Sequence, residues 1–201
     1  KRQEPIRIFI GLVQGRGPIA AAQQALAELE RTGAFRRDTI VIELPAGSGW
    51  INNYSVSAYE FLTHGDCATV TLQFSYLPSV FCYVVDRKAP INAARELIAA
   101  VQSRINDMPE DNRPKLYFAG ESLGCYGIVE NYRDLEELLA ACDGAVFTGP
   151  PRMTAFTRRL ARARDRGSLE RLPLIDAGRH VRFASVPAHM EHDAFGNDYQ
   201  R

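Results

Sequence analysis

The chain has 201 residues, a length that predicts one domain, with two small domains as the alternative. Hydrophobic residues make up 46% of it and charged residues 24%, which excludes disordered, collagen-like and coiled-coil chains. Basic and acidic residues number 24 each, so the net charge is zero and a nucleic-acid partner, which needs a basic surface, is not expected. The longest apolar stretch, around residues 77–85, is too short to cross a bilayer.

In chain order, the first half predicts a strand at 6–12, a helix from Pro18 to Gly33, a strand at 39–44, a short helix capped by Ser55 or Ser57 that reaches about His64, and a strand at 68–74. The proline favours a helix start because its fixed φ suits the first turn, and the glycine favours a helix end. The strand at 39–44 is rich in β-branched residues, which indicates burial on both faces.

The second half predicts a helix at 91–105, a strand at 115–119, a helix from about Ser122, a helix at 135–141 and a strand at 145–148. This strand–helix alternation predicts an α/β fold in which right-handed crossovers build a mainly parallel sheet with helices on both faces. After Pro151 the pattern changes to an arginine-rich segment at 152–171, and then to an irregular stretch with at most a short strand at 181–184. We expect 1–201 to be one domain, with 151–201 as a lid-like segment.

The motif with the most chemical content is Gly120-Glu121-Ser122-Leu123-Gly124, which fits G-x-S-x-G. It follows a predicted strand and begins a predicted helix, which is the setting that a nucleophile elbow requires. Glycines at both ends remove side chains that would collide with neighbouring strands at so tight a turn. The motif therefore predicts Ser122 as a catalytic nucleophile, against the alternative of a serine that merely caps a helix between turn glycines.

A serine nucleophile also needs amide donors for the oxyanion of its tetrahedral intermediate. The amide of Leu123, immediately after the serine, is one candidate. The second donor is expected from the glycine-rich loop at 46–50, with Ser48 and Gly49 as the candidate residues. The alternative is that this loop is only a flexible connector.

A competing motif lies near the start of the chain. Gly15 and Gly17 with Ala20 fit G-x-G-x-x-A, and Glu43 ends the next strand where a dinucleotide site would place a ribose-binding acid. The loop before Gly15 is longer than a phosphate-binding turn, and Pro18 removes an amide that a pyrophosphate would use. We therefore expect no cofactor.

Cysteine and histidine patterns give no metal site. The cysteines have no C-x-x-C or zinc-finger spacing and are expected to be buried structural thiols; they are Cys67, Cys82, Cys125 and Cys142. A zinc site built on the late histidines would lack a suitably spaced third ligand. No bound metal is therefore expected.

Beyond the elbow, several stretches together identify a family. They are 30–35 (ERTGAF), 45–50 (PAGSGW), 65–70 (GDCATV), 73–79 (QFSYLPS), 120–124 (GESLG) and 143–151 (DGAVFTGPP). With these stretches the chain resembles a bacterial family of membrane-anchored proteins with a C-terminal α/β-hydrolase catalytic domain. The resemblance implies an α/β-hydrolase fold, Ser122 as the nucleophile and a membrane-associated protein.

The resemblance also implies an acid and a histidine that follow the serine in the chain. Members of the family carry them on a further strand and a late loop, so we expect both residues to lie beyond Arg201 and the chain, which begins at Lys1 without a Met, to be truncated at both ends. If the chain is complete, His189 or His192 with Asp193 is the candidate base and acid. The alternative for these residues is an exposed polar tail.

The sequence thus predicts a serine hydrolase that cleaves carboxylic esters, with a small-molecule or lipid substrate. An acyltransferase or a thioesterase would use the same serine, and a non-catalytic module that binds a lipid or a partner is the alternative from another class. The arginines of 152–171 predict a solvated helix face, with contact to anionic membrane headgroups or to an anionic acyl substrate as the alternative.

Overall fold

The computed structural model describes residues 3–152 and 154–199. The chain divides into two compact units, Lys1–Pro151 and Arg152–Arg201. The first unit contains the sheet and the predicted elbow, and the second contains the arginine-rich segment. The boundary falls at the point where the strand–helix alternation of the sequence ends.

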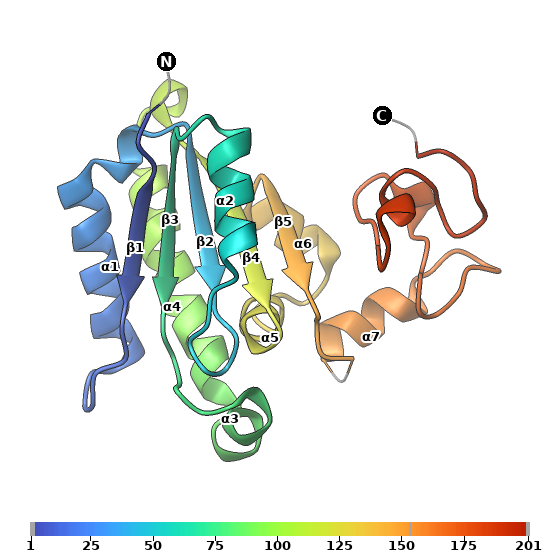
Figure 1. The fold of residues 1–201 in the computed structure, drawn as a ribbon, viewed down its shortest axis with the longest axis horizontal. Coiled ribbons are helices and arrows are strands. Elements are labelled where there is room, and N and C mark those ends of the chain that lie inside the picture. The colour runs from blue at the N-terminus through green and yellow to red at the C-terminus, as the bar shows by residue number, and fades with distance from the viewer. Residues whose placement is uncertain (1–2, 153, 200–201) are drawn as a thin grey trace. The chain divides into compact units, whose positions relative to one another are not determined.

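A five-stranded sheet forms the centre of the first unit (Figure 1). Its strands are β1 (Ile6–Ile10), β2 (Thr39–Leu44), β3 (Cys67–Leu72), β4 (Lys115–Glu121) and β5 (Gly144–Thr148). All neighbouring pairs are parallel, in the order β1-β3-β2-β4-β5. Every residue of β2 and β3 is buried, as expected for β-branched strands covered on both faces. The predicted parallel sheet is confirmed.

Helices cover both faces of this sheet. Three of them pack together and against the strands on one face: α1 (Pro18–Thr32), α4 (Lys88–Asn106) and α5 (Leu123–Val129). A fourth, α2 (Asn53–Leu62), lies on the opposite face, in front of the strands in Figure 1. This arrangement follows from right-handed crossovers. The chain runs from β1 through α1 past β3 to β2, and then returns through α2 to β3, so the two crossovers run in opposite directions and their helices lie on opposite faces.

The core lies between the sheet and the three helices α1, α4 and α5. Small residues such as Ala25 and Ala94 are fully buried on α1 and α4, which lets these helices approach each other closely. Large side chains from the strands fill the space beneath them, among them Ile40, Ile42 and Phe118. The four cysteines are free thiols, of which Cys142 alone is half-buried and the others are buried, so the predicted structural role is confirmed.

Some local details of the first unit differ from the sequence predictions. The cap of α2 is Asn52, whose side-chain oxygen accepts a hydrogen bond from the backbone N–H of Tyr54 at 2.9 Å, and not Ser55 or Ser57. A helix that was not predicted, α3 (Ser79–Val85), follows β3, and α4 begins at Lys88 instead of at residue 91. The predicted helix at 135–141 is confirmed as α6 (Leu135–Ala141), capped by Asp134.

The second unit is mostly irregular. Its helix α7 (Ala155–Arg162) is capped by Thr154, whose hydroxyl accepts from the backbone N–H of Thr157 at 2.9 Å, and Phe156 is buried. Short 3₁₀ turns follow at Asp176–Gly178 and Pro187–Met190. The short strand expected at 181–184 does not form, because no other segment of the described chain pairs with it.

Candidate active site

Ser122 occupies the turn between β4 and α5. Its backbone has φ 52° and ψ −111°, a conformation that side-chain-bearing residues rarely adopt. Such a conformation costs about 1–3 kcal/mol and persists only where the surrounding structure holds it. The predicted helix-capping alternative requires an extended cap residue with φ below zero, and Ser122 is not in that conformation.

The two glycines of the motif make this turn possible. A Cβ at residue 124 would lie 2.6 Å from the carbonyl carbon of Leu44 and 2.7 Å from the carbonyl oxygen of Pro45. A Cβ at Gly120 would lie 2.7 Å from the backbone nitrogen of Cys125. The elbow therefore presses against the end of β2, and its glycines are needed for contact between backbones.

Hydrogen bonds fix the backbone of Ser122 and leave its side chain uncommitted. Its N–H donates to the carbonyl oxygen of Thr148 on β5 at 2.9 Å, and its own carbonyl accepts from the N–H of Tyr126 at 3.1 Å. Within residues 3–152 and 154–199, the hydroxyl makes no hydrogen bond, and the residue is half-buried. The amide of Leu123 is the first in α5 and has no acceptor inside that helix. A reacting oxygen near Ser122 would find this amide available.

The loop after β2 lies next to the elbow, because the contact at Gly124 is with the end of that strand. The amide of Gly49 donates to the carbonyl oxygen of Ala46 at 2.9 Å, and that of Ala46 donates to Trp50 at 3.1 Å, so both are used inside the loop. The amide of Ser48 makes no hydrogen bond within the described part of the chain. Of the two predicted loop donors, Ser48 is thus the one whose amide remains available.

Gln73, at the end of β3, was missed by the sequence interpretation. Its side-chain oxygen accepts a hydrogen bond from the backbone N–H of Leu12 at 3.1 Å, and its backbone N–H donates to the carbonyl oxygen of Ile10 at 2.9 Å. A Cβ at Gly49 would lie 2.9 Å from the Gln73 side-chain carbon Cδ, so the amide packs directly against the loop. The sequence signal that could have pointed to Gln73 is its place directly after a strand, but many loop glutamines have the same position.

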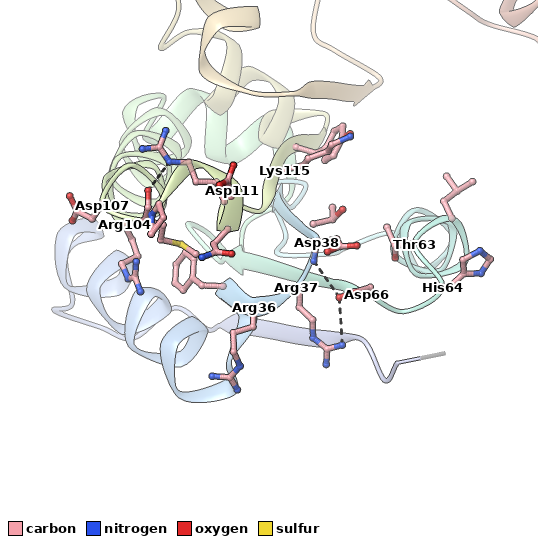
Figure 2. A pocket seen from close by; sticks show the side chains of 18 residues that line it. Arg36, Arg37, Asp38, Thr63, His64, Asp66, Arg104, Asp107, Asp111 and Lys115 are labelled. Carbon is pink, nitrogen blue, oxygen red and sulfur yellow. Dashed lines mark hydrogen bonds and ion pairs between the residues drawn. The ribbon is translucent and has the colours of Figure 1, made fainter. Parts of the chain in front are cut away.

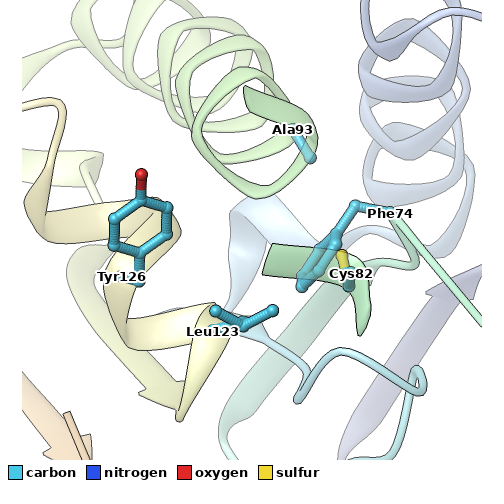
Figure 3. Packing of buried hydrophobic residues seen from close by; sticks show 5 residues of the cluster. All are labelled: Phe74, Cys82, Ala93, Leu123 and Tyr126. Atoms are coloured by element: carbon cyan, nitrogen blue, oxygen red, sulfur yellow. The ribbon is translucent and has the colours of Figure 1, made fainter. Parts of the chain in front are cut away.

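The side chain of Leu123 is anchored in an apolar cluster (Figure 3). It is buried with Phe74, Cys82, Ala93 and Tyr126, which come from α3, α4, α5 and the segment after β3. Since the amide of Leu123 is the predicted oxyanion donor, this packing holds the donor in place. It also joins α3 to the elbow.

Glu43, the acid of the competing dinucleotide motif, has an unusual environment in the structure. It lies on β2 beside Ala119 of β4, is 4% exposed, and its Oε2 makes no hydrogen bond within the described residues. Burial, reinforced by the nearby charge of Glu121, raises the pKa of Glu43 to about 7. A ribose-binding acid must be open to its ligand, so the burial of Glu43 argues against the dinucleotide interpretation.

Replacing Glu43 with glutamine is expected to change how stability depends on pH. The folded protein holds the Glu43 proton more tightly than the unfolded chain, so stability is lost as the pH rises from 4.5 to about 7. This loss is on the order of 3 kcal/mol, and Glu43→Gln should remove it. Urea unfolding at a series of pH values measures the difference.

Glu121→Gln provides the matched variant for this experiment. It removes the neighbouring charge that helps to raise the pKa of Glu43. The pH range over which stability is lost should therefore become narrower, but the loss should remain because burial also raises this pKa. Parallel stability profiles for the wild type and Glu43→Gln would show that the Glu43 carboxyl does not titrate in this range.

The candidate base and acid residues lie in the second unit and do not form the expected pair. Asp193 accepts hydrogen bonds from the backbone N–H groups of Phe195 and Asn197, at 2.8 and 2.9 Å, and so closes a turn. His192 pairs instead with Asp198, with 2.7 Å between Nδ1 and Oδ1. The ring of His189 lies 3.2 Å from the hydroxyl of Ser185. A catalytic role for these histidines stays a prediction.

Among the residues that the structure describes, no group of three or more His, Cys, Asp or Glu side chains is arranged to hold a metal ion. No helix in the described ranges is long and apolar enough to cross a membrane.

A sequence model described as the alpha/beta-hydrolase family matches residues 6–200, nearly the whole chain. The chain belongs to this family. The match confirms the predicted fold class, and it agrees with a strand–turn–helix in which a serine, not a glycine, has positive φ. No curated protein and no solved structure matches the chain. As an α/β-hydrolase, the protein belongs to a family whose members are generally hydrolytic enzymes.

Proposed function

We propose that this α/β-hydrolase cleaves carboxylic esters of acyl or lipid type through an acyl-enzyme on Ser122. The observation that supports this most strongly is the backbone of Ser122, at φ 52° and ψ −111° between β4 and α5. A serine held in this way costs stability, and its hydroxyl makes no hydrogen bond within the described residues that would offset the cost, so catalysis is the function that accounts for it.

In the proposed reaction, the Ser122 oxygen attacks the ester carbonyl carbon while a general base removes the hydroxyl proton. The oxyanion that forms accepts hydrogen bonds from the amides of Leu123 and Ser48, each worth about 3 kcal/mol of barrier. The base returns the proton to the leaving alcohol, and the acyl-enzyme remains. Water, deprotonated by the same base, then attacks the acyl carbon and releases the acid and the free serine.

The base in this scheme is a histidine oriented by an acid. The sequence offers His189 and His192 for this role, or a histidine beyond Arg201. An alcohol in place of water would make the protein an acyltransferase, and a thioester would be cleaved by the same apparatus. These alternatives share Ser122 as the nucleophile.

A fluorophosphonate probe tests the proposal on the full-length protein, because it reacts with activated serines and not with ordinary ones. Wild type is expected to be labelled, with the label mapped to Ser122 by peptide mass spectrometry, and Ser122→Ala is expected to remain unlabelled. Ser103→Ala, on an exposed position of α4, is the control and should label like wild type. A folded wild type that takes up no label would favour the non-catalytic binding module.

A further inference from the structure

The two edges of the sheet in the first unit differ sharply in charge. The loops that follow β2 and β3 lie at the carboxyl edge, where Ser122 is also placed. No charged residue occurs from Leu44 to Tyr59, or from Cys67 to Val85, in a chain that is 24% charged. The segments after β2 and β3 are therefore uncharged over long stretches, although Glu121 directly precedes Ser122.

The opposite edge is densely charged. It contains an open groove of about 1040 Å³ near the amino ends of the strands (Figure 2). Side chains of both signs line the groove, among them Arg36, Arg37, Asp66, Arg104, Asp111 and Lys115. Several of them are paired, as Arg37 is with Asp66 at 3.9 Å. Such a surface is well solvated, and its mixture of charges does not indicate a particular ligand.

At the carboxyl edge, large apolar side chains are exposed, from 63% to 87% of their surface. They come from the loop after β2, the start of α2, the segment after β3, and α3. We call this set the apolar rim; it consists of Trp50, Tyr54, Tyr76, Phe81, Val84 and Val85. Figure 1 shows α3 and the loop after β2 at the same end of the sheet, beyond the tips of the strands. Several large exposed apolar side chains at one end of a sheet are typical of an interaction site.

The inner side of α3 shows that this exposure is not a sign of a loosely placed helix. Cys82 is 2% exposed and packs with Phe74 and Leu123, while Tyr83 meets the ring of Tyr126 edge-on at 5.5 Å. The helix is thus fixed against the elbow by one side and presents Phe81 and Val84 on the other.

Cations lie directly beside the apolar rim. Arg87 and Lys88 follow α3 and are exposed, and the guanidinium of Arg87 lies 5.7 Å from the centre of the Tyr83 ring. The carboxylate of Asp86 accepts hydrogen bonds from the backbone N–H groups of Lys88 and Ala89 at the start of α4. Aromatic and aliphatic side chains with cations next to them are typical of segments that lie at a membrane interface.

We infer that the apolar rim docks on a lipid surface with anionic headgroups. Charge complementarity supports this, since Arg87 and Lys88 would meet the headgroups while Phe81 and Val84 enter the apolar layer. The docking itself does not need the proposed function; only the identification of the layer as the source of substrate rests on it.

Sedimentation of the protein with vesicles of equal parts phosphatidylcholine and phosphatidylglycerol tests the inference. The double variant Phe81→Gln/Val84→Gln is expected to lower the partition coefficient by about tenfold or more, because it removes the apolar groups that insert. Phe61→Gln/Leu62→Gln is the matched control: these residues are 76% and 75% exposed but lie at the other end of α2. Binding of the control should equal that of wild type.

A second comparison addresses the headgroups. Arg87→Gln/Lys88→Gln should weaken binding to the mixed vesicles and leave binding to pure phosphatidylcholine vesicles unchanged. The inference is overturned if wild type does not sediment with the mixed vesicles, or if both apolar double variants lose binding equally. It is also overturned if sedimentation velocity shows a wild-type dimer that Phe81→Gln/Val84→Gln dissociates, because the rim would then be covered by a second copy of the chain.

Labelling of Ser122 by a soluble fluorophosphonate, measured in the same variants, separates the two proposals. Variants that lose vesicle binding but keep labelling would support docking as a function of the rim alone. Vesicle binding by Ser122→Ala at the wild-type level would show that docking does not depend on the nucleophile. A wild type that binds vesicles but takes up no label would contradict the proposed catalysis and leave the docking inference intact.

Discussion

A glycine in place of Ser122 is expected to abolish ester hydrolysis and to stabilise the fold at the same time. Glycine adopts positive φ without a Cβ clash, so Ser122→Gly releases the strain stored at φ 52°. We expect the free energy of unfolding to rise by about 1 kcal/mol, after allowance for the greater entropy of glycine in the unfolded chain. Hydrolysis should fall by about 10⁴-fold or more, because the nucleophile is gone.

Ser122→Ala is the control for this prediction. It removes the same hydroxyl, so the loss of hydrolysis should be equally large, but it keeps a Cβ and therefore the strain. Thermal unfolding should place the glycine variant about 2–4 °C above the alanine variant. Equal melting temperatures for the two variants would mean that the turn is not strained, and they would remove the main support for the catalytic role.

Alanine at position 124 is expected to damage both stability and activity. The added Cβ would lie 2.6 Å from the carbonyl carbon of Leu44, and a backbone group cannot rotate away as a side chain can. The elbow or the end of β2 must shift, at a cost of about 3 kcal/mol. The shift also separates Leu123 from the loop that holds Ser48, so hydrolysis should fall by about 100-fold. Urea unfolding and steady-state kinetics measure the two effects.

Gly17→Ala is the matched control, since a Cβ there would meet nothing within 4 Å and the backbone has φ −73°. It should cost less than about 1 kcal/mol, through its position as the cap of α1, and should leave hydrolysis unchanged. A Gly124→Ala protein as stable and as active as this control would contradict the close contact between the elbow and β2.

Elements with a strong local pattern could be predicted from the sequence. The β-branched run at 39–44 coincides with β2, and Pro18 and Gly33 bound α1 as their backbone preferences require. The α3 helix could not be predicted, because a short apolar run without a capping residue does not distinguish a helix from a strand. The predicted cap of α2 was wrong because Asn52 and two serines, all residues that favour the cap position, occur within a few residues of one another.

The expected strand at 181–184 failed for a different reason. A strand exists only where another segment pairs with it through backbone hydrogen bonds, and in the described part of the second unit no segment pairs with 181–184 in this way. A burial pattern alone cannot reveal this, since Val181, Phe183 and their neighbours resemble an edge strand in composition.

The sequence by itself determined the sharp turn that carries Ser122, because a strand, a turn between glycines and a helix are all encoded within a few consecutive residues. Only the tertiary structure decided that, within the described residues, the Ser48 amide is available while that of Gly49 is not, that one buried carboxylate oxygen of Glu43 makes no hydrogen bond, and that α3 is joined to Leu123. Each of these depends on contacts between residues far apart in the chain. Such contacts are set by the order of the strands and the packing of the helices, which no local pattern contains.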